Sequence, residues 1–155
     1  MVSWTEFQSA APAIADEGRR LLYRVGEGAA LLATVRDDAP PRIHPIKVGI
    51  VNEGLYAFLL DSPKRRDLEL DGRFALHAHQ DPAAPSEFTM RGHARMVESG
   101  DIRGPVAAEW YFAVDDAYRL FDFSIESALL GTRPSADSWP PTYGSWKAPP
   151  SAPGR

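Results

Sequence analysis

Between residues 29 and 97 the chain alternates short apolar runs with turn sequences, and this succession constrains the fold most strongly. The turns are only a few residues long, as at 37–41 and 52–54. Strands joined by such short turns run antiparallel, because a parallel pair needs a crossover of about a dozen residues or more. The regular alternation of strands with helices that is typical of Rossmann folds and TIM barrels is missing.

Six runs have the length and composition of strands. They cover residues 29–35, 42–51, 55–60, 73–79, 87–97 and 118–128. In the fifth run apolar and polar residues alternate strictly, which is typical of a strand with one buried face. Helices are predicted over 63–70, from Pro105 to about Val114, and over 3–24, where Gly18 divides the segment and Pro12 starts a turn. A closed or half-open antiparallel barrel with peripheral helices accommodates these elements.

Length and composition set the limits within which a function can be sought. The 155 residues suit one domain, which we assign to 1–147, followed by a disordered tail over 148–155. The net charge of −4 argues against a nucleic-acid partner or an acidic membrane surface. The absence of cysteine excludes disulfides and thiolate chemistry. No signal peptide and no apolar run of roughly 18 residues is present, so we expect a cytoplasmic protein.

The start of the predicted helix over 63–70 carries an unusual concentration of positive charge. Ser62 is a good N-cap and Pro63 suits the first helical position. The residues that follow are Lys64, Arg65 and Arg66. A helix N-terminus disfavours each cation by about 0.3–1 kcal/mol, so the arrangement favours a phosphate that would meet free N–H groups, the Ser62 hydroxyl and the cations. The alternative is a solvated basic patch, partly offset by Asp67 and Glu69.

A proline interrupts the second predicted strand. Pro45 removes a ladder donor, so it marks a sheet edge, a bulge or a place where something other than a strand is accommodated. A bulge there would change which residues share a face, and Arg42 and Lys47 could then approach one ligand. The alternative is an ordinary edge strand with exposed charges.

Taken together, these segments resemble the pyridoxamine 5′-phosphate oxidase-like family of flavin-binding split barrels. The segments that carry the resemblance are Leu31-Leu32-Ala33-Thr34-Val35, Pro41-Arg42-Ile43-His44-Pro45, Gly54-Leu55-Tyr56-Ala57-Phe58, Ser62-Pro63-Lys64 with Asp67-Leu68, Arg73-Phe74-Ala75-Leu76 and Glu87-Phe88-Thr89-Met90-Arg91-Gly92-His93-Ala94. The resemblance implies a mainly β (α+β) fold, a six-stranded antiparallel split β-barrel with short peripheral helices. It also implies a homodimer with two flavin mononucleotide (FMN) molecules in grooves between the subunits.

The resemblance assigns cofactor-binding roles to particular residues. Those that match the family's phosphate contacts are Arg42, Lys47, Ser62 and Lys64. Ile43 and His44 would border the isoalloxazine ring, and Phe58 would lie nearby. The implied activity is that of a flavin-dependent oxidoreductase acting on a small organic substrate, with no catalytic side chain assigned.

The chain departs from the family pattern at two places. Glu87 stands where the vitamin-processing oxidase has a glutamine that helps hold the flavin, and a carboxylate there would disfavour an anionic reduced flavin. The oxidase's C-terminal Arg-Leu motif is also absent, so we do not expect pyridoxamine 5′-phosphate oxidation. Two alternatives stay open: a deazaflavin-dependent reductase, or a non-catalytic flavin- or heme-binding stress protein.

Two further groups of residues have competing interpretations. His77, His79, His93 and Glu87 could in principle ligate a metal, but their spacing is unspecific and we expect no metal site. The segment 139–147 holds two tryptophans and a tyrosine, which are costly to expose. These aromatic residues either wall a groove or partner interface, or cover the protein's own barrel.

Overall fold

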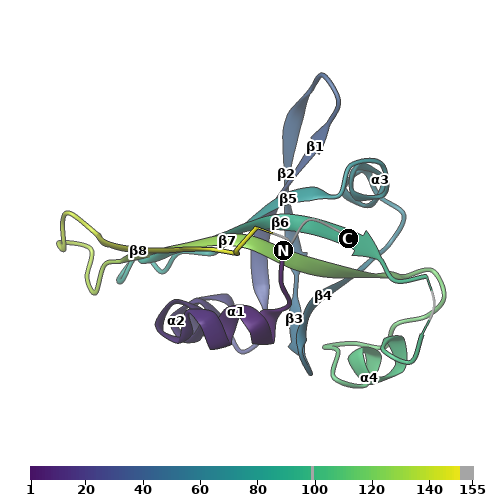
Figure 1. Cartoon of the computed structure of the whole chain (residues 1–155), viewed down its shortest axis with the longest axis horizontal. Coiled ribbons are helices and arrows are strands. Elements are labelled where there is room, and N and C mark those ends of the chain that lie inside the picture. Colours follow the sequence, from purple (N-terminus) through teal and green to yellow (C-terminus); the bar gives the residue numbers. More distant parts are fainter. Residues whose placement is uncertain (99, 151–155) are drawn as a thin grey trace.

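The described residues of the chain, 1–98 and 100–150 of a computed structural model, form one antiparallel sheet of eight strands (Figure 1). The strands are β1 Ala29–Arg36, β2 Ala39–Lys47, β3 Gly49–Val51, β4 Gly54–Leu59, β5 Arg73–Ala78, β6 Glu87–Met96, β7 Arg119–Thr132 and β8 Thr142–Lys147. They follow the order β2-β1-β5-β6-β7-β4-β3, and β8 pairs with β7. The sheet curls until β2 contacts β4, which gives a half-open barrel.

The prediction of a mainly antiparallel β fold is confirmed, but the count of six strands was wrong. The predicted strand over 42–51 is divided at Val48, which is buried. The backbone N–H of Val48 donates to the Gly28 carbonyl at 3.0 Å, and its carbonyl accepts from the Tyr111 hydroxyl at 2.6 Å. These contacts turn the chain from the edge of β1 to the edge of β4. The additional strand β8 begins after Pro140 and Pro141, so neither proline interrupts its pairing with β7.

Four helices surround the sheet in the described part of the chain. They are α1 Trp4–Ala10, α2 Pro12–Leu22, α3 Pro63–Leu70 and α4 Arg103–Ala108. The N-terminal segment breaks at Ala11, and Pro12 is the first residue of α2, not the start of a turn. The expectation that Gly18 breaks the segment was wrong, because Gly18 lies inside α2 against the ring of Phe88. The helix predicted from Pro105 to Val114 begins earlier and ends at Ala108.

Replacing Gly18 with alanine is expected to destabilise the fold by about 2 kcal/mol, although alanine is the better helix former. A Cβ atom at this position would lie 2.4 Å from a carbon of the Phe88 ring. Urea denaturation measures the change in the free energy of unfolding. Gly104→Ala in α4 is the matched control, because nothing lies within 4 Å of a Cβ there. An equal effect of the two substitutions would contradict the packing argument.

The core lies on the inner face of the curled sheet. The alternation predicted for β6 is confirmed, since Phe88, Met90 and Ala94 are buried while Arg91 on the other face is exposed. In Figure 1, α1 and α2 lie together on one side of the sheet, and α2 contacts β5, β6, β7 and β8. A smaller cluster joins α4 to β4 through Tyr56, Phe58, Val106, Trp110 and Leu120. It fixes the end of β4, from which the chain enters α3.

The two remaining expectations concern the predicted C-terminal tail and the absence of a membrane-spanning segment. Ala148 is buried and donates its N–H to Glu126 at 2.7 Å. Residues 151–155, which make up most of the predicted tail over 148–155, lie outside the described residues. None of the helices in the described part is long and apolar enough to cross a bilayer.

Candidate functional site

An open groove of about 350 Å³ lies where β2 ends, β4 leads into α3, and the segment after α4 leads into β7. It brings together four of the seven predicted cofactor-binding residues: Lys47, Phe58, Ser62 and Lys64. The other residues that line it are Pro45, Ile46, Leu59, Leu60, Asp61, Phe112 and Tyr118. We call this feature the groove.

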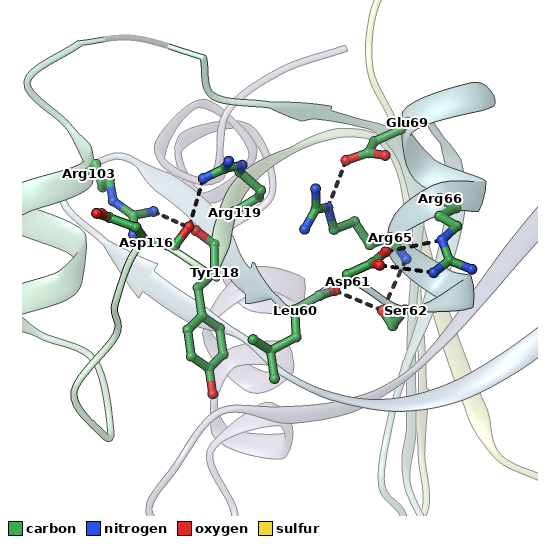
Figure 2. Close-up of polar contacts among 10 residues, drawn as sticks. All are labelled: Leu60, Asp61, Ser62, Arg65, Arg66, Glu69, Arg103, Asp116, Tyr118 and Arg119. Atoms are coloured by element: carbon green, nitrogen blue, oxygen red, sulfur yellow. Dashed lines mark hydrogen bonds and ion pairs between the residues drawn. The ribbon is translucent and has the colours of Figure 1, made fainter.

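Local sequence builds the start of α3 at one side of the groove (Figure 2). Ser62 caps the helix: its hydroxyl accepts from the Arg65 N–H at 3.4 Å and donates to the Leu60 carbonyl at 3.0 Å. Pro63 holds the first helical position, where the missing N–H costs nothing. No acidic residue lies in this first turn, so its partial positive charge stays uncompensated from within the helix.

Two of the three cations in the first turn of α3 already have acidic partners. The Arg65 guanidinium donates to Glu69 at 2.8 Å, and that of Arg66 donates to both oxygens of Asp61 at 3.0 and 3.1 Å (Figure 2). Lys64 has no ion pair among the described residues. The sequence predicts that three cations converge on one phosphate. In the structure carboxylates hold Arg65 and Arg66, so among the three only Lys64 stays available to a phosphate.

The strand β2 is an edge strand, as one of the two interpretations of Pro45 predicts. Pro45 pairs opposite Leu31, and the register runs without a shift from Lys47 to Arg42. Because there is no bulge at Pro45, Arg42 and His44 share one face of β2 and Lys47 lies on the other. Arg42 therefore does not line the groove, although Lys64 does.

His44 lies close to the positive charges of this region. Its Nε2 atom is buried and has no hydrogen-bond partner among the described residues. Burial lowers the pKa of His44, and the charges of Lys64 and Arg42 lower it further, against the opposing effect of Asp67. The imidazole is therefore neutral near pH 7 and can both donate and accept a hydrogen bond. Ile43, by contrast, is 70% exposed on the opposite face of β2.

Lys47 is held in place by two neighbours. Its ammonium group forms an ion pair with Glu27, and it lies 5.3 Å from the centroid of the Tyr111 ring. Tyr111 is fixed in turn by hydrogen bonds to the backbone of Gly28 and Val48. Burial raises the pKa of the Tyr111 phenol, which therefore stays protonated and keeps donating to Val48.

The far wall of the groove is aromatic, and of its residues the sequence analysis predicted only Phe58. Phe58 is buried and meets Trp110 edge to face at 5.1 Å between ring centroids. Trp110 contacts Phe112 at 6.4 Å, and Phe112 contacts Tyr118 at 5.6 Å. Phe112 is 40% exposed at the rim. The Trp110-Tyr111-Phe112 triplet is the sequence signal for this wall, but only the fold brings Phe112 into the groove with the start of α3.

Hydrogen bonds from two arginine side chains to backbone carbonyls hold the segment that carries Tyr118. Arg103 donates to the Tyr118 carbonyl at 3.1 Å, and Arg119 donates to the Asp116 carbonyl at 2.9 Å (Figure 2). The side chains of Tyr118 and Leu60 extend in the same direction in this view, and both line the groove. The arrangement combines a flat apolar wall with a hydroxyl and an unpaired ammonium group. It suits a ligand with a planar ring and an anionic group.

The remaining candidate residues lie away from the groove. Glu87 begins β6 and lies beside Gly131 of β7. In the segment 139–147, Trp146 packs against Phe7 at 4.9 Å and so covers the protein's own body. Trp139 is 76% exposed, with the Arg133 guanidinium over its ring at 5.4 Å. No group of three metal-ligating side chains occurs in the residues that the structure describes.

Comparison with solved structures identifies the fold. The chain matches a putative pyridoxamine 5′-phosphate oxidase of Listeria innocua at a TM-score of 0.57 and 15% identity, covering 73% of this chain and 94% of the other. The heme storage protein HutZ of Vibrio cholerae matches at a TM-score of 0.60 and 20% identity, covering 75% and 89%. A heme-binding protein of Mycobacterium smegmatis matches at 0.63 and 17%, covering 86% of this chain and 57% of that longer one.

These structures share the fold of the chain at low sequence identity. A protein of Clostridium acetobutylicum related to general stress protein 26 matches at a TM-score of 0.57 and 12% identity, covering 84% of this chain and 95% of the other. No protein-family model matches the sequence. A comparison with curated proteins finds no match. The chain therefore has the fold of pyridoxamine 5′-phosphate oxidase-like proteins, as the sequence resemblance predicts.

Proposed function

We propose that this protein binds FMN in the groove as a homodimer and uses it in an oxidoreductase reaction on a small organic substrate. One observation carries the proposal: the groove joins an anion-attracting helix start to an aromatic wall. FMN has the matching two parts, a phosphate and a planar isoalloxazine ring. The similarity to pyridoxamine 5′-phosphate oxidase-like structures supports the same assignment.

The phosphate is assigned to the start of α3. Ser62 and the free backbone N–H groups of the first turn supply donors, and Lys64 supplies a charge that no carboxylate neutralises in the described residues. Arg42 approaches the same helix from β2, where its Nε lies 3.8 Å from Asp67. Lys47 lines the groove from the face of β2 opposite Arg42 and is paired with Glu27, so the phosphate is assigned to Ser62, Lys64 and Arg42. Charge-assisted hydrogen bonds of this kind contribute about 1.5–3 kcal/mol each.

The ring is assigned to the apolar side of the groove. Phe112 and Tyr118 offer aromatic surface there, and Phe58 supports them from behind, with the Arg103 guanidinium 5.0 Å from the centroid of its ring. Neutral His44 lies outside the lining of the groove, on the face of β2 that carries Arg42. FMN, when bound, supplies the hydride chemistry, and the protein supplies orientation and electrostatics. Ile43 lies on the exposed face of β2. Its predicted contact with the ring therefore requires that another molecule cover this face.

A second copy of the chain is the proposed occupant of that exposed face. Pairing of β1 with β2 places Leu31 and Pro45 opposite each other, and Ala33 and Ile43 opposite each other, on one face. Leu31 and Ile43 are both exposed there, which leaves apolar area in contact with water. Multi-angle light scattering tests this part of the proposal, and a mass of twice 17.0 kDa is the expected result.

Heme is the second candidate ligand, favoured by one specific observation. His44 has a neutral imidazole whose buried Nε2 lacks a hydrogen-bond partner among the described residues, and neutral imidazole is a common iron ligand. Ligation of heme iron by this atom requires that the side chain turn outward, since His44 does not line the groove. Two of the matched structures are named as heme-binding or heme storage proteins. Heme also shares the ligand chemistry of the groove, because it is planar and carries anionic carboxylates.

Visible absorption of the purified protein tests the proposal. The protein is mixed with FMN or with hemin, desalted, and compared with an untreated sample. Retention of a flavin spectrum, and its bleaching by NADH or NADPH, is the expected result. A retained Soret band that is lost in His44→Ala would favour heme. A protein that retains neither ligand would contradict both candidates and leave the deazaflavin coenzyme as the next ligand to test.

A further inference from the structure

Beside the groove, a buried carboxylate lies among side chains of two neighbouring strands. Asp67 of α3 is only 3% exposed and accepts a hydrogen bond from the hydroxyl of Thr34 at 2.8 Å. Its two oxygens lie 3.9 Å from Arg36 Nε and 3.8 Å from Arg42 Nε. We call Thr34, Arg36, Arg42 and Asp67 the Asp67 cluster. Arg36 has no place in the sequence-based set of ligand-binding residues.

The two arginines are near Asp67 but are not bonded to it. Both distances exceed hydrogen-bond range, and the Nε of Arg36 is buried without a partner among the described residues. About two thirds of each arginine side chain is covered, since 35% of Arg36 and 32% of Arg42 are exposed. Guanidinium donors that are partly removed from water and unpaired are costly, so this geometry is suited to a further acceptor.

The charged side chains around Asp67 carry a net positive charge. Asp67 contributes one negative charge, whereas Arg36, Arg42 and the nearby Lys64 contribute three positive charges. Lys64 is near because it lies three residues before Asp67 on α3, and residues at this spacing are neighbours on a helix surface. The local surplus is therefore two positive charges. A phosphate monoester carries between about 1.5 and 2 negative charges at pH 7, which matches this surplus.

Strand alternation places Arg36 on the same face of β1 as Thr34, at a point where the β1–β2 pairing is irregular. Thr34 pairs with Arg42, but Arg36 pairs with Ala39, so the register shifts between Thr34 and Arg36. Thr34 and Arg36 are two residues apart on one strand, and both reach Asp67. Arg42 reaches the same carboxylate from the opposite strand. The hairpin thus presents two arginines to α3 from adjacent positions.

We infer that Arg36 is a further ligand of the phosphate group, and that Asp67 positions it together with Arg42. This inference rests on the proposed function only in taking FMN as the ligand. Its own claim concerns the phosphate group and not the ring. Two guanidinium groups that flank one carboxylate can donate several hydrogen bonds to phosphate oxygens while Asp67 keeps their stems in place. The Asp67 cluster therefore selects a phosphate monoester over an uncharged ligand with the same ring.

Arg36→Gln tests the inference through the ratio of affinities for FMN and riboflavin, which differ by the phosphate. The substitution is expected to weaken FMN binding at least tenfold and to leave riboflavin binding unchanged. Arg36→Lys, which keeps the charge and loses the planar fork, should give an intermediate loss. Arg20→Gln is the charge-matched control, because Arg20 is on the exposed side of α2 and pairs with Glu17. Flavin fluorescence titration measures all affinities, and circular dichroism checks the fold.

Binding of inorganic phosphate separates this inference from the proposed function. Phosphorus NMR follows phosphate binding to the wild-type protein and to Arg36→Gln. Phosphate binding that requires Arg36 in a protein without FMN affinity would support the inference and refute the proposed cofactor. FMN binding that depends on Lys64 and Arg42 but not on Arg36 would refute the inference alone. Absence of any effect of Arg36 on FMN or phosphate overturns it in every case.

Discussion

Simultaneous replacement of Arg42 and Lys64 with alanine is expected to lower the affinity for FMN at least tenfold. Each residue is assigned a charge-assisted contact with the phosphate worth about 1.5–3 kcal/mol, so the loss of affinity exceeds about a hundredfold if the two contacts are additive. The affinity for riboflavin should stay the same, because it has no phosphate. The fold should be retained, since neither side chain donates a hydrogen bond within the described part of the chain and Arg36 remains beside Asp67 when Arg42 is removed.

Fluorescence titration with FMN and with riboflavin measures this effect directly. Arg20→Ala combined with Arg24→Ala is the matched control, because it removes the same charge from exposed positions in and just after α2. An equal loss of affinity in this control would mean that only net charge attracts FMN. An unchanged affinity in the Arg42 and Lys64 variant would mean that the phosphate lies elsewhere.

The largest effect on stability is expected from Asp67→Ala, at about 3 kcal/mol. The substitution leaves the buried Thr34 hydroxyl without its acceptor. It also leaves Arg36 and Arg42 facing each other without the carboxylate between them. Chemical denaturation at two salt concentrations measures the loss. Part of it should disappear at high salt, where the repulsion between the arginines is screened.

Two companion variants make the stability prediction specific. Asp101→Ala removes the same charge from an exposed position and should change the free energy of unfolding by less than about 0.5 kcal/mol. Thr34→Val removes the other partner of the buried hydrogen bond. Its effect should combine with that of Asp67→Ala in a clearly non-additive way, because the two residues share one interaction. Simple addition of the two effects would refute the assigned role of the bond.

Helices and strands that are specified by their own residues could be predicted from the sequence. The alternation over 87–97 predicts β6 and its buried face because each side chain's environment follows from its position in the strand. The helix α3 is predicted over the same residues that form it, since Ser62 and Pro63 are start signals within the helix itself. The groove brings together Lys47, Phe58, Ser62 and Lys64, to which the family resemblance assigns cofactor contacts.

Features that depend on distant partners could not be predicted. The break at Val48 requires Gly28 and Tyr111, which lie far from it in the sequence. The strand β8 is stabilised by pairing with β7, and its own composition does not suggest a strand. Arg36 reads as an ordinary residue beside a turn, because only the fold brings Asp67 beneath it.

The prolines of β2 restrict how copies of this chain can associate. β2 is a free edge of the sheet, and an unpaired edge normally serves as a template on which another strand can grow. Pro40, Pro41 and Pro45 have no N–H group, and they occupy both alternating positions of this edge. Alternate residues of an edge strand direct their N–H groups outward, so at least one of these prolines removes a donor that an incoming strand would need. Continuous sheet extension, the route to fibrils, is disfavoured at this edge, and the exposed face of the β1–β2 hairpin is the surface left for self-association.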